Sequence, residues 1–200
     1  LHLCHHNLES IETTSTKHDL LAEVCMAAKY EGGSIKTDYT PHQLRNNDSA
    51  SQLCTVLARS FADIGDIVRG RDLFYGNPQE SAQRKVLDEK LKTIFKKIHE
   101  DVTKTSDKNG KKSAEELQKR YEGDEDKNFF KLREDWWTAN RATIWEALTC
   151  EVGSGTYFRQ TCGTGTATYE KCRCSDKSKA GNGDVSIVPT YFDYVPQYLR

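Results

Sequence analysis

Apolar side chains recur every three or four residues in several long stretches of the chain, and this periodicity constrains the fold most. Between residues 49 and 69 the repeat consists of Leu53, Leu57, Phe61, Ile64 and Val68. An α-helix completes a turn in 3.6 residues, so these positions share one face that must be buried against another element. Clear two-residue alternation, the mark of a β-strand, is missing. The pattern therefore predicts an all-α fold.

The same periodicity, read together with capping and stop signals, predicts a series of helices. Gly32 and Gly33 are expected to end the first helix, before a polar, turn-rich stretch, and Gly70 to end the second. Residues 151–184 are rich in Gly, Thr, Ser and Cys and are expected to form a long irregular loop. An extended entry into a final helix follows from residue 189. The predicted helices are 16–31, 49–69, 80–103, 113–121 and 128–150.

Aromatic residues dominate the apolar face of the predicted helix 128–150. We expect Trp145 and Leu148 to pack against Phe61 and Ile64, because bundle helices bury their apolar faces against each other. The adjacent pair Trp136-Trp137 could form a stacking platform for sugars or bases. The simpler interpretation places one in the core and one against a neighbouring helix, because adjacent helical residues point about 100° apart.

Seven cysteines are widely spaced, and none forms the C-x-x-C pattern of zinc ribbons and thioredoxins. This usage favours a disulfide-linked extracellular domain, in which an odd count leaves at least one thiol without a partner in the chain. One hypothesis ties the first helix to the Trp-rich helix through a bond between Cys25 and Cys150. Cys54 and Cys162 then pair with Cys172 and Cys174 in an order that stays open. Cys4 is expected to pair with a residue upstream of the chain.

The 200 residues carry a formal net charge of -1, so bulk electrostatics argue against a nucleic-acid-binding protein. No apolar run approaches the roughly 20 residues needed to cross a bilayer. The first residues lack the features of a signal peptide and include no Met. We expect a piece of a longer protein, whose membrane attachment is a transmembrane segment outside this chain.

Residues that could carry chemistry each have a simpler structural interpretation. Asp63 and Asp66 could share a helix face as paired carboxylates, but Arg69 follows at the spacing of an ordinary ion pair. His5 and His6 beside Cys4 lack a second ligand pair at helical spacing, which disfavours a metal site. We therefore expect no catalytic residue, no metal and no cofactor, with a soluble helical enzyme or metal protein as the alternative.

Several segments together resemble one family. They are "LLAEVCMAAKYEG", "NNDSASQLCTVLARSFADIGDIVRGRDLF", "LREDWWTANRATIWEALTC", "YFRQTCG", "KCRC" and "VPTYFDYVPQYLR". In order and wording they are similar to the α-type Duffy-binding-like (DBL) domain of the variant erythrocyte membrane proteins of Plasmodium falciparum. The resemblance implies a disulfide-stapled helical bundle with long irregular loops. It assigns residues 1–48 to the end of the first subdomain and its junction, and residues 49–200 to the second; the third subdomain is missing.

The resemblance also implies a function, that of a host-cell adhesion module in a variant surface antigen. Such a module acts on the extracellular face of the infected erythrocyte membrane, as part of a larger membrane protein subject to antigenic variation. The implied partners are erythrocyte or endothelial surface receptors, sulfated glycans such as heparan sulfate, blood-group sugars and antibodies, with rosetting as one outcome. It implies no enzyme activity. The alternative within the family is an invasion ligand of the free parasite.

A sulfated glycan needs several basic side chains on one face, and one cluster could supply them. Asp88, Glu89, Glu100 and Asp101 are interleaved with part of it, so a solvated mixed-charge face is the competing interpretation. The candidate glycan-binding residues are Lys92, Lys96, Lys97, Lys111, Lys112 and Lys119.

Overall fold

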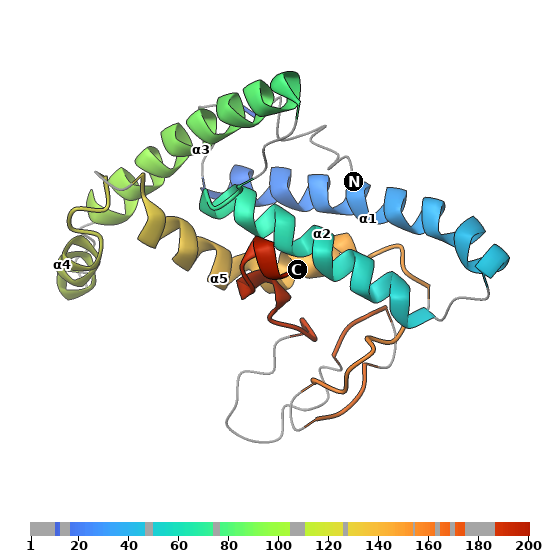
Figure 1. The fold of residues 1–200 in the computed structure, drawn as a ribbon. Helices are drawn as coiled ribbons and strands as arrows, with labels where there is room; N and C mark the ends of the chain where they lie inside the picture. The colour runs from blue at the N-terminus through green and yellow to red at the C-terminus, as the bar shows by residue number, and fades with distance from the viewer. Residues whose placement is uncertain are drawn as a thin grey trace.

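The computed structural model shows a helical bundle whose centre is formed by three helices (Figure 1). Helices α1 (Lys17–Asn46), α2 (Ala50–Arg69) and α5 (Phe130–Leu148) pack on one another, while α3 (Pro78–Lys104) and α4 (Lys111–Arg120) extend to one side. Two short 3₁₀ helices, η3 (Phe192–Tyr194) and η4 (Gln197–Leu199), bring the C-terminus back over α2. The structure describes residues 11–12, 17–46, 50–73, 77–104, 111–125, 128–153, 155–162, 165–168, 171–174 and 187–200.

The all-α prediction is confirmed. Within those ranges there is no strand, and Cys162 and Thr166 form an isolated β-bridge. The predicted boundary after residue 48 falls between the end of α1 and the start of α2 and stays a prediction.

Helix α1 does not end at Gly32 and Gly33, so that prediction is wrong, and so is the turn-rich stretch expected after them. The helix continues to Asn46. A Cβ atom on Gly32 would lie 1.8 Å from the carbonyl oxygen of Leu148, so this glycine lets α1 approach the end of α5 closely. The glycine is therefore required by helix packing, and packing along the whole of α1 outweighs the low helix propensity of the pair.

The other helix limits lie close to the predicted ones. Gly70 ends α2 with φ at 71°, and the amides of Gly70 and Arg71 donate to the carbonyls of Ile67 and Asp66 in a Schellman motif. Helix α3 opens with Pro78 in the first turn, and the Asn77 side chain accepts a hydrogen bond from the Glu80 amide at 2.9 Å.

Aromatic residues join the central helices as expected. The Phe61 ring on α2 lies 5.0 Å from Trp137 and 5.1 Å from Trp145, both on α5. Trp136 points to α3 instead, where its ring is 6.1 Å from Phe95. The two adjacent tryptophans are thus buried against different helices, and the predicted core packing of Trp145 against Phe61 is confirmed.

Buried arginines hold the ends of the elements together, and the sequence pattern did not predict them. Arg133 donates to the carbonyls of Ile67 and Val68 at the end of α2, and Arg141 forms an ion pair with Asp193 at 2.7 Å. The indole of Trp137 donates to the same Asp193 carboxylate at 2.9 Å. These side chains consequently fix the C-terminal segment. It forms two short 3₁₀ helices instead of the final helix that was expected.

Two disulfides join Cys54 to Cys172 and Cys162 to Cys174, which settles the order that the sequence left open. Cys25 and Cys150 are free cysteines, so the predicted bond between them is wrong. The helix register explains this result. The residue of α1 that meets Leu148 is Gly32, and it lies seven residues, or about 10 Å of helix, beyond Cys25. Cys4 lies outside the described residues.

Candidate functional site

The acidic pair considered for catalysis belongs to the scaffold. Asp66 is bound by Arg69 at 3.0 Å and by Arg200, and Asp63 lies 3.1 Å from Arg200. Burial raises the pKa of both carboxyl groups, and Arg200 opposes that shift. The expected ion pair between Asp66 and Arg69 is therefore present, and both carboxylates also anchor Arg200 to α2.

The structure places the predicted lysines in different environments. Lys92 is half-buried and bridges Asp88 at 3.0 Å and Glu89 at 2.8 Å, and the hydrogen bonds that it donates to Glu89 and Asp88 raise its pKa. Lys96 and Lys97 on α3 and Lys119 on α4 are exposed, on two helices that contact each other. The side chains of Lys111 and Lys112 lie outside the described part of the structure.

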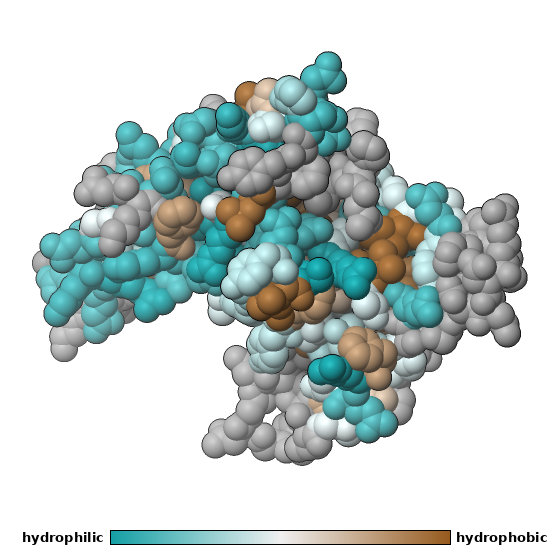
Figure 2. Space-filling model, viewed as in Figure 1, coloured by the Kyte–Doolittle hydropathy of each residue, from teal (hydrophilic) through white to brown (hydrophobic). Residues whose placement is uncertain are grey.

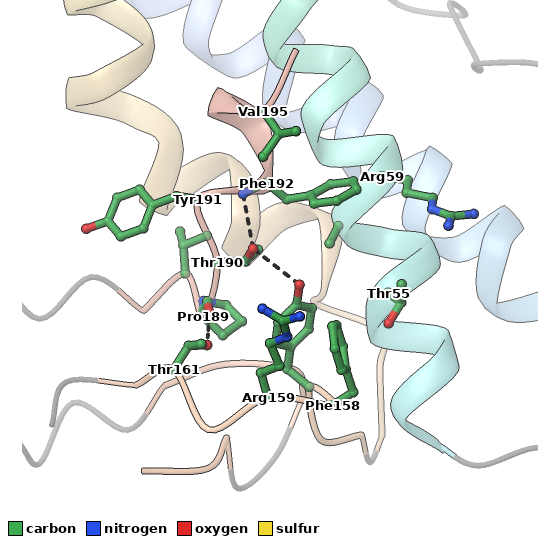
Figure 3. A pocket seen from close by; sticks show the side chains of 13 residues that line it. Thr55, Arg59, Phe158, Arg159, Thr161, Pro189, Thr190, Tyr191, Phe192 and Val195 are labelled. Carbon is green, nitrogen blue, oxygen red and sulfur yellow. Dashed lines mark hydrogen bonds between the residues drawn. The ribbon is translucent and has the colours of Figure 1, made fainter. Parts of the chain in front are cut away.

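A groove of about 660 Å³ lies elsewhere, between α2 and the irregular C-terminal part of the chain. One wall is the α2 surface around Thr55, Ala58 and Arg59, and the others are residues 157–161 and 188–195 (Figure 3). This volume falls within the range of about 300–1,000 Å³ that is usual for ligand sites.

Side-chain hydrogen bonds hold the two irregular walls of the groove together. The Tyr157 hydroxyl donates to Thr190 Oγ1 at 3.3 Å, and Thr161 Oγ1 donates to the carbonyl of Pro189. The disulfide from Cys54 to Cys172 ties residues 171–174, which lie between the two irregular walls in the sequence, to the first turns of α2. The groove is thus a built feature, because a disulfide and hydrogen bonds position both of its irregular walls.

The lining of the groove combines apolar surface with positive charge. Its described residues include Arg59 and Arg159 and no acidic side chain. The Arg159 guanidinium lies 5.2 Å from the centre of the Phe158 ring and stands between the walls, while Arg59 extends outward from α2 at the rim (Figure 3). Phe158 and Tyr191 are 55% and 69% exposed, which is unusual for large aromatic side chains.

The surface around the groove differs from the surface over the predicted lysines. Figure 2 shows a mainly hydrophilic face over α3 and α4, on which a few hydrophobic residues lie, and hydrophobic residues also interrupt the surface near the C-terminus. Among the described residues, no cluster of His, Cys, Asp and Glu could hold a metal ion. None of the helices described here is both long enough and apolar enough to cross a membrane.

Sequence reasoning missed the groove, although two of its residues lie in a quoted motif. In "YFRQTCG", Phe158 and Arg159 were interpreted only as part of the family resemblance. An aromatic residue beside an arginine in a Cys-rich loop is a weak signal by itself. The groove exists only because residues 188–195 fold back beside that motif, and no local pattern encodes this contact.

Comparison with known proteins agrees with this architecture. Two solved structures from the Plasmodium falciparum varO strain each match 99% of the chain: the NTS-DBL1α domain of PfEMP1 (40% identity, TM-score 0.68) and its double domain with CIDRγ (39%, 0.70). An ICAM-1-binding PfEMP1 DBLβ domain matches 75% of the chain at 33% identity with a TM-score of 0.59, over 33% of its own length. The chain spans 40% of the NTS-DBL1α structure and 25% of the double domain.

A search among curated proteins found no match. The family model of the Duffy binding domain, in contrast, matches residues 1–200. Both the family model and the fold of solved DBL domains thus extend over essentially the whole chain, and this protein belongs to the Duffy binding domain family.

Proposed function

We propose that the chain is part of a host-cell adhesion module that binds a receptor through the groove between α2 and the C-terminal segment. The observation that carries this proposal is the groove, whose described lining holds no acid and exposes aromatic side chains and arginines. Aromatic residues and arginine are the types most enriched at the energetic centres of protein interfaces. The ICAM-1-binding relative supports a host receptor as the partner class.

The remaining polar clusters favour a binding module over an enzyme. Asp63 and Asp66 are held by arginines in the scaffold, and Asp193 is enclosed by Arg141 and Trp137. A general base needs access to a substrate proton, and these carboxylates are committed to structural partners. The proposed location follows from the family: the domain belongs to a variant antigen on the surface of infected erythrocytes.

A second candidate function is binding of sulfated glycans through the basic side chains of α3 and α4. The supporting observation is the exposure of Lys96, Lys97 and Lys119 on neighbouring helices. Lys92, which is paired with two acids, is expected to contribute least of the six lysines. Charge-driven binding of this kind weakens with salt, because exposed charges are screened over about 8–10 Å at physiological ionic strength.

Cell adhesion of the purified 200-residue chain tests both candidates. We expect binding to erythrocytes or endothelial cells that is lost after protease treatment of the cells and reduced in the Arg159→Gln variant. Loss after heparinase treatment, together with loss in a Lys96→Ala, Lys97→Ala and Lys119→Ala variant, supports the glycan candidate instead. A chain that adheres to neither cell type contradicts the adhesion proposal.

A further inference from the structure

The hydroxyl groups that line the groove are largely engaged within the protein. The Thr161 hydroxyl donates a hydrogen bond to the Pro189 carbonyl. Thr190 Oγ1 accepts from the Tyr157 hydroxyl at 3.3 Å and from the Phe192 amide at 3.0 Å, which uses both of its acceptor positions. A neutral sugar, whose recognition depends on many hydrogen bonds, therefore finds few available partners here.

The guanidinium groups are the strong polar groups that remain. The guanidinium groups of Arg59 and Arg159 form no ion pair or hydrogen bond with another described residue, and that of Arg159 lies over the Phe158 ring. A guanidinium carries five N–H donors in a planar fork that matches a carboxylate in a bidentate pair. Because the described lining contains no acid, a carboxylate from a ligand has no competitor among these residues.

The rest of the lining is apolar and suits a hydrocarbon side chain beside that carboxylate. Phe158, Val188, Phe192 and Val195 contribute to the walls, together with Ala58 on α2. A cavity of about 660 Å³ is large enough for a few amino-acid side chains, and burial of an aliphatic or aromatic side chain there favours binding.

We propose that the groove binds a short peptide segment of a protein receptor, in which an acidic side chain pairs with Arg159 while a neighbouring apolar side chain packs against Phe158 and Phe192. Arg59 at the rim adds long-range attraction for the same acid. This inference rests on the proposed adhesion function and names its partner class: an acidic and apolar peptide motif rather than a carbohydrate.

Selection of a phage-displayed random peptide library on the immobilised 200-residue chain tests the proposal. We expect enriched sequences with Asp or Glu next to an aliphatic or aromatic residue. An enriched peptide, synthesised with a fluorophore, should bind the Arg159→Gln variant about tenfold or more weakly, because a hydrogen bond to a charged group contributes about 1.5–3 kcal/mol. Replacing the peptide's acid with its amide should weaken binding to a similar degree.

Matched variants separate the groove from general charge effects. Lys131→Gln removes an exposed positive charge from the start of α5 and should leave peptide binding unchanged. Arg159→Lys keeps the charge without the planar fork and should give intermediate affinity. Because Arg159 is exposed, these variants should keep the parent's circular dichroism spectrum and unfolding midpoint. Phe158→Ala changes no charge on the same wall of the groove, and this variant should also lose peptide binding.

Three results would overturn the inference. They are enrichment of no peptide, a consensus without acids, and equal affinity for the parent and Arg159→Gln. Binding of a heparin oligosaccharide that depends on Arg159, with no acidic peptide enriched, would assign the groove to a glycan instead. Cell adhesion that persists in Arg159→Gln contradicts the peptide site while leaving the adhesion function standing, so the two failures are distinguishable.

Discussion

Substitution of the two adjacent glycines of α1 tests the packing of the bundle, because their surroundings differ while their helical position is nearly the same. A Cβ on Gly32 would lie 1.8 Å from the Leu148 carbonyl oxygen, whereas a Cβ on Gly33 would meet only the Glu151 side chain at 3.3 Å. Ordinary contact begins near 3.4 Å, so Gly32→Ala requires α1 and α5 to separate by about 1.6 Å. Gly33→Ala requires only a small rotation of a flexible side chain.

The expected changes in the free energy of unfolding have opposite signs. Each alanine gains about 1 kcal/mol in helix propensity over glycine. At Gly32 the overlap with a rigid backbone atom should cost about 3 kcal/mol, the upper part of the usual range for overpacking. We therefore expect Gly32→Ala to destabilise the chain by about 2 kcal/mol and Gly33→Ala to stabilise it by up to about 1 kcal/mol.

Urea-induced unfolding, followed by tryptophan fluorescence, measures both changes, because two of the tryptophans are close to Phe61 in the core. If the glycines ended a helix instead, alanine would be unfavourable at both positions. Equal effects of the two substitutions, or a stabilising Gly32→Ala, would refute the close approach of α1 and α5.

The remaining predictions concern buried and paired side chains. Asp193→Asn should lower the free energy of unfolding by about 3–5 kcal/mol in urea titrations, because buried Arg141 loses its counter-charge; a loss below about 1 kcal/mol contradicts this. Trp145→Ala should cost about 3–5 kcal/mol, and an unchanged melting temperature argues against its burial. The hydrogen bonds that Arg120 donates lower the pKa of Asp135, so Asp135→Asn should destabilise at neutral pH, and the difference should shrink as pH falls below the ordinary pKa of an aspartate; a difference that stays constant as pH falls through this range contradicts it.

The sequence was sufficient for most helix limits because their signals are local. The periodic apolar face of α2, the glycine at its end and the proline at the start of α3 act within one or two turns of their own position. The family resemblance rested on similar grounds, since long motifs in order need no knowledge of contacts. Packing of Trp145 against Phe61 was also predictable, because both residues lie on long apolar faces that a bundle must bury.

Local signals failed where a residue serves a distant neighbour. Gly32 has the pattern of a helix stop, but its contact is Leu148, more than a hundred residues away in the chain. Cys25 lies on α1 and Cys150 lies two residues beyond the end of α5, and these helices touch, yet their register separates the two cysteines. A periodic pattern indicates which face is buried and leaves the register undetermined, so a disulfide cannot be inferred from it.

The sequence alone determined the helical class, the disulfide-linked character and the family of this protein, because composition, periodicity and motif order are properties of the chain itself. Only the tertiary structure decided that Arg159 and Phe158 face residues 188–195 across a groove, and that Lys92 forms ion pairs with Asp88 and Glu89. The physical reason is that a binding site depends on which polar groups remain without partners after folding. Contacts between segments far apart in the chain decide which polar groups these are.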